Sequence, residues 1–218
     1  VPSYSTHSVA QVAFAHILAH VHAVERHTAS VVDEGRWSAG PDWSYTVTPQ
    51  TELAGKTLGV VGFGAIGQQI ARVALAFGMH VQVHSRTEKT AAGLEAVQWV
   101  GLDGVFSTSD VLVLACPETP DTRGMVNAET LASMKPSALL INVARGGLIV
   151  EADLADALNN GRIAGAGVDV LSQEPPASDH PLLSAKNVTV TPHVAWGTFE
   201  ARTRLLQEAA ENVRAYLA

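Results

Sequence analysis

The chain has 218 residues, nearly half of them apolar, and a formal net charge of −7. This length can bury the core of one large domain, and we expect a single domain. With 14 Lys and Arg and no basic run, the sequence lacks the positive surface that binding to a nucleic-acid backbone requires. We therefore do not expect nucleic acid as a partner.

Cys116 is the only cysteine, so no disulfide can form within the chain, and the composition favours a reducing compartment. There is no run of about eighteen uncharged apolar residues, and the first residues do not have the pattern of a signal peptide. We expect a soluble, cytoplasmic protein without a membrane partner. The chain begins with Val1 rather than Met, which we interpret as processing or trimming.

Residues 1–56 are predicted to form a long helix and a loop. Apolar residues recur at helical spacing from Ser5 to about Val32, which indicates one amphipathic helix. The loop that follows, residues 33–56, contains three large aromatic side chains, Trp37, Trp43 and Tyr45. Such a loop is expected to pack on other protein surface, for example on a second subunit.

After residue 56, short β-branched runs alternate with helical segments. Strands are predicted at Thr57–Val61, Val81–His84, Val111–Ala115, Ala138–Val143, Gly165–Asp169 and Val188–Thr191, and helices at Ala65–Phe77, Val150–Asn159 and Phe199–Leu217. Nearly continuous apolar strands between helices are typical of a parallel sheet covered on both faces. We therefore predict an α/β fold with a doubly wound parallel sheet, whose core is 57–192 and whose last segment, 193–218, contains a C-terminal helix.

A glycine-rich turn, Gly62-Phe63-Gly64-Ala65-Ile66-Gly67, joins the first predicted strand to its helix. This GxGxxG spacing between a strand and a helix is typical of Rossmann-type dinucleotide-binding domains. Gly62 permits the tight turn, Gly64 lets the backbone approach a pyrophosphate, and Gly67 lets the helix lie close to the sheet. The free N–H groups of the helix start, at Ala65 and Ile66, attract the anion. The alternative is a glycine-rich turn without a ligand.

The segment after the second predicted strand reads His84-Ser85-Arg86-Thr87. In NAD-binding domains an Asp or Glu at this place accepts the ribose 2′-hydroxyl and would repel a 2′-phosphate. Here Arg86 can pair with a phosphate, and Ser85 and Thr87 can donate hydrogen bonds to its oxygens. The sequence therefore predicts a preference for NADP over NAD. The alternative is that Arg86 is a solvated surface residue.

Three further stretches place polar or charged residues just beyond apolar strands, where open α/β sheets bind ligands. They are Asn142-Val143-Ala144-Arg145-Gly146-Gly147, Asp169-Val170-Leu171-Ser172-Gln173-Glu174-Pro175 and Thr191-Pro192-His193-Val194-Ala195-Trp196. Together with the glycine turn, and in this order, they resemble the D-isomer-specific 2-hydroxyacid dehydrogenases over essentially the whole chain. The resemblance implies an enzyme that transfers hydride between a nicotinamide cofactor and a small 2-hydroxy or 2-keto acid.

Within that family the chain is most similar to the glycerate dehydrogenase or hydroxypyruvate reductase branch. The similarity lies in Ser8-Val9-Ala10-Gln11, Gly35-Arg36-Trp37-Ser38, Leu53-Ala54-Gly55-Lys56-Thr57-Leu58-Gly59 and Pro192-His193-Val194-Ala195-Trp196. This branch implies hydroxypyruvate or glyoxylate as substrate. It also implies a homodimer whose symmetric contact is made by the helix and aromatic loop of residues 1–56.

The reduction of a 2-keto acid requires a cation for the substrate carboxylate and an acid that protonates the new alkoxide. Arg145 suits the first role because a guanidinium is always charged and grips a carboxylate with two hydrogen bonds. His193 suits the second because an imidazole gains and loses a proton near neutral pH. In the family pattern, Glu174 is the carboxylate that orients the histidine. The resemblance, and not the spacing, assigns these three roles.

The same resemblance places Asp169 against the nicotinamide carboxamide and Cys116-Pro117 on the adenosine side. Cys116 is expected to be a small buried residue or part of the pocket wall rather than a nucleophile. The residues expected to bind the cofactor are Gly62, Gly64, Ala65, Ile66, Gly67, Ser85, Arg86, Thr87, Cys116, Pro117, Thr122, Val143, Ala144, Arg145, Asp169, His193 and Ala195.

The same residues bear on other activities. Formate oxidation is disfavoured because the related formate dehydrogenases carry Gln where this chain has Glu174. Phosphite dehydrogenase stays open as an alternative, since it shares the three catalytic residue types. A second alternative is a dinucleotide-sensing regulatory module without turnover, but such a module has no need of Arg145, Glu174 and His193 together.

Three histidines of the predicted first helix, His16, His20 and His27, lie at helical spacing. No Asp, Glu or Cys near them completes a tetrahedral set, so we expect no metal site and interpret them as a helix face, with a subunit contact as a further possibility.

The family that the chain resembles has two domains. The sequence contains neither the N-terminal segment nor the short C-terminal return from which the substrate domain is built, so we expect that domain to be absent. The active-site cleft would then have one wall, and we expect this chain to bind cofactor without efficient turnover.

Overall fold

The computed structural model describes residues 1–217. Seven strands form one sheet: β1 (Thr57–Val61), β2 (His80–His84), β3 (Gln98–Trp99), β4 (Val111–Leu114), β5 (Leu139–Asn142), β6 (Gly165–Val168) and β7 (Val188–Val190). Their order across the sheet is β3-β2-β1-β4-β5-β6-β7, and every neighbouring pair is parallel. The first strand, β1, therefore lies inside the sheet, with β2 and β3 on one side of it and β4 to β7 on the other. This arrangement confirms the predicted doubly wound parallel fold.

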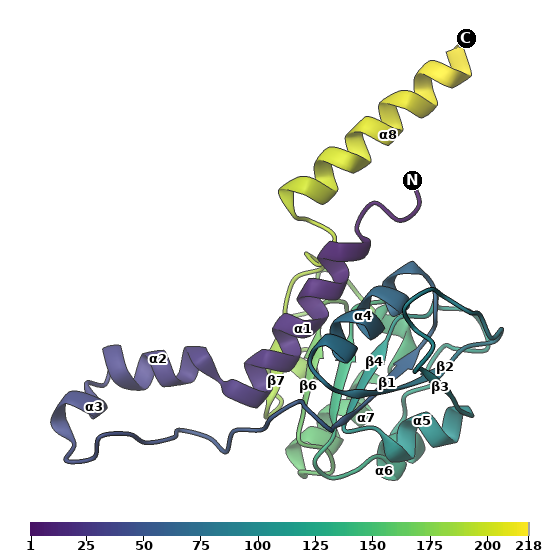
Figure 1. The fold of residues 1–218 in the computed structure, drawn as a ribbon. Coiled ribbons are helices and arrows are strands. Elements are labelled where there is room, and N and C mark those ends of the chain that lie inside the picture. Colours follow the sequence, from purple (N-terminus) through teal and green to yellow (C-terminus); the bar gives the residue numbers. More distant parts are fainter. Residues whose placement is uncertain (218) are drawn as a thin grey trace.

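The helices are α1 (Thr6–His22), α2 (Val24–Val32), α3 (Arg36–Ala39), α4 (Ala65–Ala76), α5 (Leu102–Thr108), α6 (Ala128–Ser133), α7 (Glu151–Asn159) and α8 (Phe199–Leu217), with two 3-10 turns, η1 (Gly146–Leu148) and η2 (Pro181–Leu183). None of the helices in residues 1–217 combines the length and the apolar character needed to cross a bilayer. Figure 1 shows α1 lying across the sheet while α8 projects away from it.

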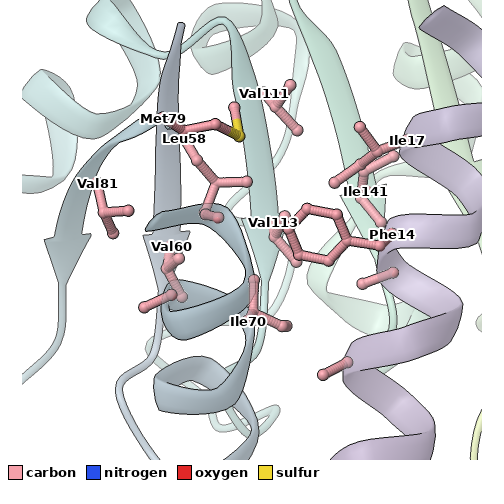
Figure 2. Close-up of a cluster of buried hydrophobic side chains, with 14 of the residues drawn as sticks. Phe14, Ile17, Leu58, Val60, Ile70, Met79, Val81, Val111, Val113 and Ile141 are labelled. Atoms are coloured by element: carbon pink, nitrogen blue, oxygen red, sulfur yellow. The ribbon is translucent and has the colours of Figure 1, made fainter. Parts of the chain in front are cut away.

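Alternate residues of each buried strand enter two separate cores. On one face, Val111 and Val113 of β4 pack with side chains of α1 and α4, which include Phe14 and Ile70 (Figure 2). On the other face, the intervening Leu112 and Leu114 pack with α5, α6 and α7. The sheet is thus covered on both faces, and this explains why its central strands are nearly continuous apolar runs.

The register of the parallel strands aligns their carboxyl ends along one edge. Val61 of β1 is paired with Leu114 of β4, Leu114 with Asn142 of β5, and Asn142 with Val168 of β6. The residues that follow these strands therefore emerge side by side, as the sequence predicted.

The N-terminal helix differs from the prediction, because it is two helices and not one. Ala23 has left-handed backbone angles, φ 47 and ψ 45, and separates α1 from α2. Its own N–H still donates to the carbonyl of Ala19. The His27 ring secures the break, since Nδ1 donates to the Ala23 carbonyl and Nε2 accepts from the N–H of Val47. The chain leaves the sheet at this point, and α2 continues away from the core (Figure 1).

The aromatic segment beyond α2 packs only locally. The Trp37 indole N–H donates to the Trp43 carbonyl, the Tyr45 hydroxyl contacts Ser30, and Arg36 lies over the Tyr45 ring. Trp43 remains 88% exposed. The aromatic surface that the sequence predicted to pack on other protein is therefore still uncovered in this single chain.

Four short elements were missing from the sequence prediction: α3, β3, α5 and α6. The strand is only two residues long, and the three helices have four, seven and six residues. A helix of fewer than two turns, or a strand of two residues, is too short to show a recognisable periodicity of apolar residues.

Candidate active site

The glycine turn adopts the conformation that its spacing predicts. Gly62 has φ +99, and a Cβ there would lie 2.6 Å from the backbone nitrogen of Cys116. A Cβ at Gly67 would collide with the carbonyl oxygen of Gly62, so glycine lets α4 lie against β1. At Gly64 a Cβ would meet no heavy atom within 4 Å. Two glycines are therefore required by the fold, whereas Gly64 faces open space.

The N-terminus of α4 is suited to bind an anion. Gly64 is its N-cap, and no side chain caps the helix. The first amides, at Ala65, Ile66 and Gly67, have no acceptor within the helix, because intrahelical bonds begin one turn later. Free N–H groups together with the positive end of the helix dipole suit a pyrophosphate. The open side of Gly64 leaves room for its approach, so the residues present fit a dinucleotide.

The end of β2 lies beside this turn. His84 is paired with Val61, and its carbonyl accepts the N–H of Gly62 at 2.8 Å. Ser85, Arg86 and Thr87 follow directly, and Arg86 and Thr87 are exposed. Within residues 1–217 the guanidinium of Arg86 has neither an ion-pair partner nor a hydrogen-bond acceptor. Its charge is therefore available to a ligand that occupies the turn.

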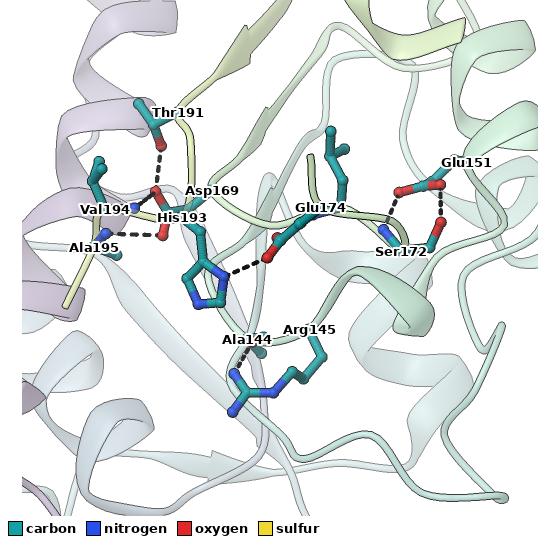
Figure 3. Close-up of polar contacts among 11 residues, drawn as sticks. Ala144, Arg145, Glu151, Asp169, Ser172, Glu174, Thr191, His193, Val194 and Ala195 are labelled. Atoms are coloured by element: carbon teal, nitrogen blue, oxygen red, sulfur yellow. Dashed lines mark hydrogen bonds and ion pairs between the residues drawn. The ribbon is translucent and has the colours of Figure 1, made fainter. Parts of the chain in front are cut away.

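His193 and Glu174 form a close pair, with Nδ1 of the histidine 2.6 Å from Oε2 of the glutamate (Figure 3). A carboxylate can only accept, so Nδ1 carries the hydrogen and Nε2 remains free to hold or release a proton. The two side chains are 43% and 35% exposed. The pair is thus accessible to a small molecule and is only partly shielded from water.

The pKa of Glu174 lies below its ordinary value. Desolvation is the largest single influence and acts upward. It is outweighed by the hydrogen bonds from His193 and from the Leu171 N–H, the latter 2.9 Å long, and by the positive charges of His193 and Arg145. Glu174 is therefore a carboxylate at neutral pH, the form that can stabilise an imidazolium.

The backbone at His193 is left-handed, with φ +53. Such a conformation costs of order 1 kcal/mol outside glycine and persists where the surroundings hold it. Its N–H donates to the carbonyls of Asp169 and Thr191 at 2.7 and 3.0 Å. The Asp169 carboxylate accepts from the Thr191 hydroxyl and from the N–H groups of Val194 and Ala195, at 2.5, 3.0 and 2.9 Å (Figure 3). Asp169, which is 1% exposed, thus fixes the segment 191–195.

The backbone of Arg145 is held in place by the side chain of Asn142. The buried Asn142 side chain donates to the Arg145 carbonyl at 2.8 Å and accepts the Ala144 N–H at 3.0 Å. The next residue is Gly146, where any Cβ would collide with the backbone of Leu171. The turn after β5 is therefore packed tightly against the turn after β6, and the exposed Arg145 guanidinium donates from Nη1 to the Ala144 carbonyl at 2.6 Å (Figure 3).

A cleft of about 610 Å³ unites half of the predicted site residues. Its lining includes these predicted residues: Ile66, Cys116, Pro117, Val143, Ala144, Arg145, Asp169, His193 and Ala195. Glu174 does not line the cleft but is hydrogen-bonded to His193, which does. Ser85, Arg86 and Thr87 lie outside the lining, next to the glycine turn. Thr122 also lies outside it, and its hydroxyl donates to the Pro117 carbonyl within a turn. The structure thus gathers residues from five strand ends at one edge.

Comparison with known proteins identifies the family. The sequence model of the D-isomer specific 2-hydroxyacid dehydrogenase, NAD binding domain, matches residues 14–195. The chain belongs to this family. This confirms the resemblance on which the site prediction was built.

Two relatives and one solved structure illustrate the similarity. The chain is 45% identical to a hydroxypyruvate reductase of Blautia hydrogenotrophica over 217 residues, which are 100% of this chain and 67% of that protein. It is 44% identical to a glycerate dehydrogenase of Methylorubrum extorquens over 87% of this chain and 59% of the relative. It is similar to an acyclic imino acid reductase in complex with NADPH and D-Arg, with TM-score 0.86, 33% identity, and 99% and 66% of the two chains covered. The chain therefore spans about three fifths to two thirds of these relatives.

Two glutamates of this dehydrogenase domain were not predicted. Glu118 lines the cleft directly after Pro117, so the rule that found the other strand-end residues could have found it. Glu151, at the start of α7, accepts the N–H of Ser172 at 2.7 Å and also contacts the Ser172 hydroxyl (Figure 3). It contacts His180 as well. It thereby holds the loop that carries Glu174. This role depends on a contact across 21 positions, which no local pattern reveals.

Cys116 is buried in the cleft wall, and burial raises the pKa of its thiol. A thiol in that state is a poor nucleophile. The three N-terminal histidines do not share one face, because His27 lies on α2, beyond the break. The ring nitrogens of His16 and His20 contact Thr189, Thr191 and the Ala166 carbonyl. Each of these histidines is thus engaged by protein groups.

Proposed function

We propose that this chain is the cofactor domain of an NADP(H)-linked reductase that converts hydroxypyruvate or glyoxylate to the D-hydroxy acid or glycolate. The observation that carries the proposal is the His193–Glu174 pair, which stands at the cleft that is also lined by Arg145 and by Ile66 of the glycine turn. The names of the two relatives, hydroxypyruvate reductase and glycerate dehydrogenase, support this substrate class.

Arg145 would bind the substrate carboxylate. Its guanidinium is exposed at the cleft and can donate two parallel hydrogen bonds to a carboxylate. Held in this way, the adjacent carbonyl of the 2-keto acid would be oriented and polarised. Reduced nicotinamide, when bound, supplies the hydride that attacks the carbonyl carbon.

His193 would protonate the carbonyl oxygen. Its Nε2 is free, since Nδ1 is committed to Glu174. As the oxygen takes up negative charge, Nε2–H would donate its proton to it, and the C=O double bond would become a C–O–H single bond. Glu174 would stabilise the imidazolium before this transfer and keep the ring oriented. In the reverse direction the neutral imidazole would accept the proton.

Asp169 was predicted to bind the nicotinamide carboxamide. Three of the roughly four acceptor positions of a carboxylate are used within the 191–195 segment. The remaining position still allows the proposed contact. We keep it as a part of the proposal, secondary to the structural role of this carboxylate.

The preference for NADP rests on Arg86. Its charge is unpaired within residues 1–217, it is exposed beside the glycine turn, and no carboxylate precedes it at the end of β2. Ser85 and Thr87 would add hydroxyl donors to a 2′-phosphate. The similar reductase in complex with NADPH supports the idea that this fold accepts the phosphorylated cofactor.

A homodimer is the second part of the proposal. Trp37 and Trp43 keep 51% and 88% of their surface exposed on the segment that projects from the core, and Val24 and Val32 of α2 are exposed as well. Large apolar groups gathered on one projecting segment are typical of a subunit contact.

The test is a substrate panel on the complete gene product, with hydroxypyruvate, glyoxylate and pyruvate, each with NADPH and with NADH. The proposal expects the highest kcat/KM for hydroxypyruvate or glyoxylate with NADPH. It fails if no 2-keto acid is turned over, or if pyruvate is the best substrate. A higher kcat/KM with NADH than with NADPH would refute only the cofactor preference.

A further inference from the structure

A chain of buried and half-buried side chains connects α1 to the segment that carries His193. Nδ1 of His16 lies 2.7 Å from the Thr189 hydroxyl, and Nε2 lies 3.2 Å from the Thr191 hydroxyl. The Thr191 hydroxyl in turn lies 2.5 Å from Oδ1 of Asp169. His16 is 4% exposed. These contacts join a helix near the N-terminus to the strand ends of the active-site edge.

The hydrogens of this chain can be assigned from its acidic end. An ionised Asp169 only accepts, so the Thr191 hydroxyl must donate to it. Thr191 therefore accepts from His16, and Nε2 of His16 must carry a hydrogen. Nδ1 of the neutral ring then accepts from the Thr189 hydroxyl. His16 and Thr191 thus each donate one hydrogen bond and accept one, which is consistent with a neutral imidazole.

The environment of His16 favours that neutral form. Desolvation lowers its pKa, Asp169 at the end of β6 raises it, and His20 on the same helix lowers it, with a net decrease. The ring fits against β6 because Gly167 has no side chain, and a Cβ there would lie 2.6 Å from Cβ of His16. The position is thus shaped for this ring.

A second contact ties the same helix to the same segment, because the buried Ser8 hydroxyl donates to the Ala195 carbonyl. The segment between Thr191 and Ala195 contains the left-handed residue His193. Its geometry depends on Asp169, which holds three donors of this segment at once. Of these three donors, only the Thr191 hydroxyl also contacts a side chain of α1, that of His16.

We propose that His16 is a positioning residue for His193, acting through Thr191 and Asp169. Loss of the His16 donor would leave Thr191 free to rotate and would weaken its bond to Asp169. The loop 191–195 would then relax, and the His193 ring would lose its fixed orientation toward the cleft. His16 does not line the cleft and would not touch substrate or cofactor. The kinetic part of this inference rests on the proposed function, but its structural part does not.

The structural test is amide hydrogen exchange on this chain. His16→Leu removes both ring contacts, and Thr191→Val removes the hydroxyl at nearly unchanged volume. Each is expected to accelerate exchange at Val194 and Ala195 about tenfold, since a buried polar group loses its partner. His16→Gln, which restores one donor and one acceptor, should recover most of the protection.

His20→Leu is the matched control. His20 lies one turn along α1 and is half-buried. Its Nε2 donates to the Ala166 carbonyl at 2.9 Å and lies 3.4 Å from the Thr189 hydroxyl, but it does not contact Thr191. It should lower the melting temperature but leave exchange at residues 194–195 unchanged. Equal acceleration in His20→Leu, or unchanged exchange in both His16→Leu and Thr191→Val, would overturn the proposal. If His16→Leu does not fold, Thr191→Val carries the test.

The kinetic test uses the complete gene product with hydroxypyruvate and NADPH. His16→Leu and Thr191→Val should lower kcat about tenfold with little change in either KM, and His16→Gln should restore it. Accelerated exchange with an unchanged kcat would overturn the positioning role. Accelerated exchange in an enzyme whose parent has no turnover would refute the proposed function and leave the structural inference standing.

Discussion

Gly64 offers a way to separate cofactor binding from folding. The change is Gly64→Ala, compared with Gly67→Ala in the same turn. At Gly64 the new Cβ would meet no protein atom within 4 Å, and φ −77 suits alanine. At Gly67 the Cβ would collide with the backbone carbonyl of Gly62, which cannot move aside as a side chain can.

The magnitudes follow from these surroundings. Alanine in place of glycine at an N-cap costs less than about 1 kcal/mol, or about 2–4 °C in Tm for a chain of this length. The collision at Gly67 costs about 3 kcal/mol, or about 6–12 °C. A methyl group at Gly64 would hold the pyrophosphate away from the α4 amides. The loss of one charge-assisted hydrogen bond would weaken NADPH binding about 10- to 100-fold.

The assay pairs a thermal melt with a fluorescence titration of NADPH. Gly64→Ala should melt close to the parent and bind NADPH weakly, whereas Gly67→Ala should melt well below it. The reasoning is refuted if Gly64→Ala binds NADPH as tightly as the parent. It is also refuted if the two variants melt at the same lowered temperature, because then both glycines would serve the fold alone.

Four further predictions follow from other contacts. Arg86→Gln should raise the Kd of NADPH about tenfold without changing that of NADH, because only NADPH has a 2′-phosphate; equal effects in a titration of both would contradict the assignment. Glu174→Gln should lower kcat/KM about tenfold in steady-state assays, a loss limited by the exposure of the pair, and an unchanged value would speak against it. Burial lowers the pKa of His16 and of His20 from an ordinary value of 6.5. The unfolded chain therefore takes up these protons first, and stability should be lost as pH falls below about 6.5, by about 1.4 kcal/mol per pH unit for each histidine. Urea unfolding of a double variant, His16→Leu with His20→Leu, should show a flatter dependence. Trp43→Ser should shift a dimer toward monomer in light scattering; an unchanged mass would place the contact elsewhere.

Much of the sheet could be predicted because its signals are local. Gly62 and Gly67 of the turn stand where a Cβ would collide with backbone atoms, and the strands β1 and β4 beside the turn are nearly continuous apolar runs. Parallel order then follows from the alternation of strands and helices. For these reasons the edge where Arg145, Asp169 and His193 meet was predictable before their distances were known.

Other features depend on contacts between distant residues. Ala23 ends α1 in a left-handed conformation although alanine is the best helix former, because the surrounding contacts outweigh its propensity. Glu174 and His193 are 19 positions apart, and only the family resemblance suggested that they pair. The contact of His16 with Thr191 spans 175 positions. A histidine at helical spacing can lie on an exposed helix face or in a buried contact, and the sequence could not distinguish these two cases.

The central claim is that His193, held by Glu174, donates the proton in a reaction for which this domain binds the cofactor. The most direct test is NADPH oxidation by hydroxypyruvate in the complete gene product and in His193→Ala, with the Kd of NADPH measured for both. We predict that His193→Ala abolishes nearly all turnover while the Kd stays close to that of the parent. Turnover that survives the substitution would contradict the claim. Tight NADPH binding without turnover in either protein would instead identify the domain as a sensor of the cofactor.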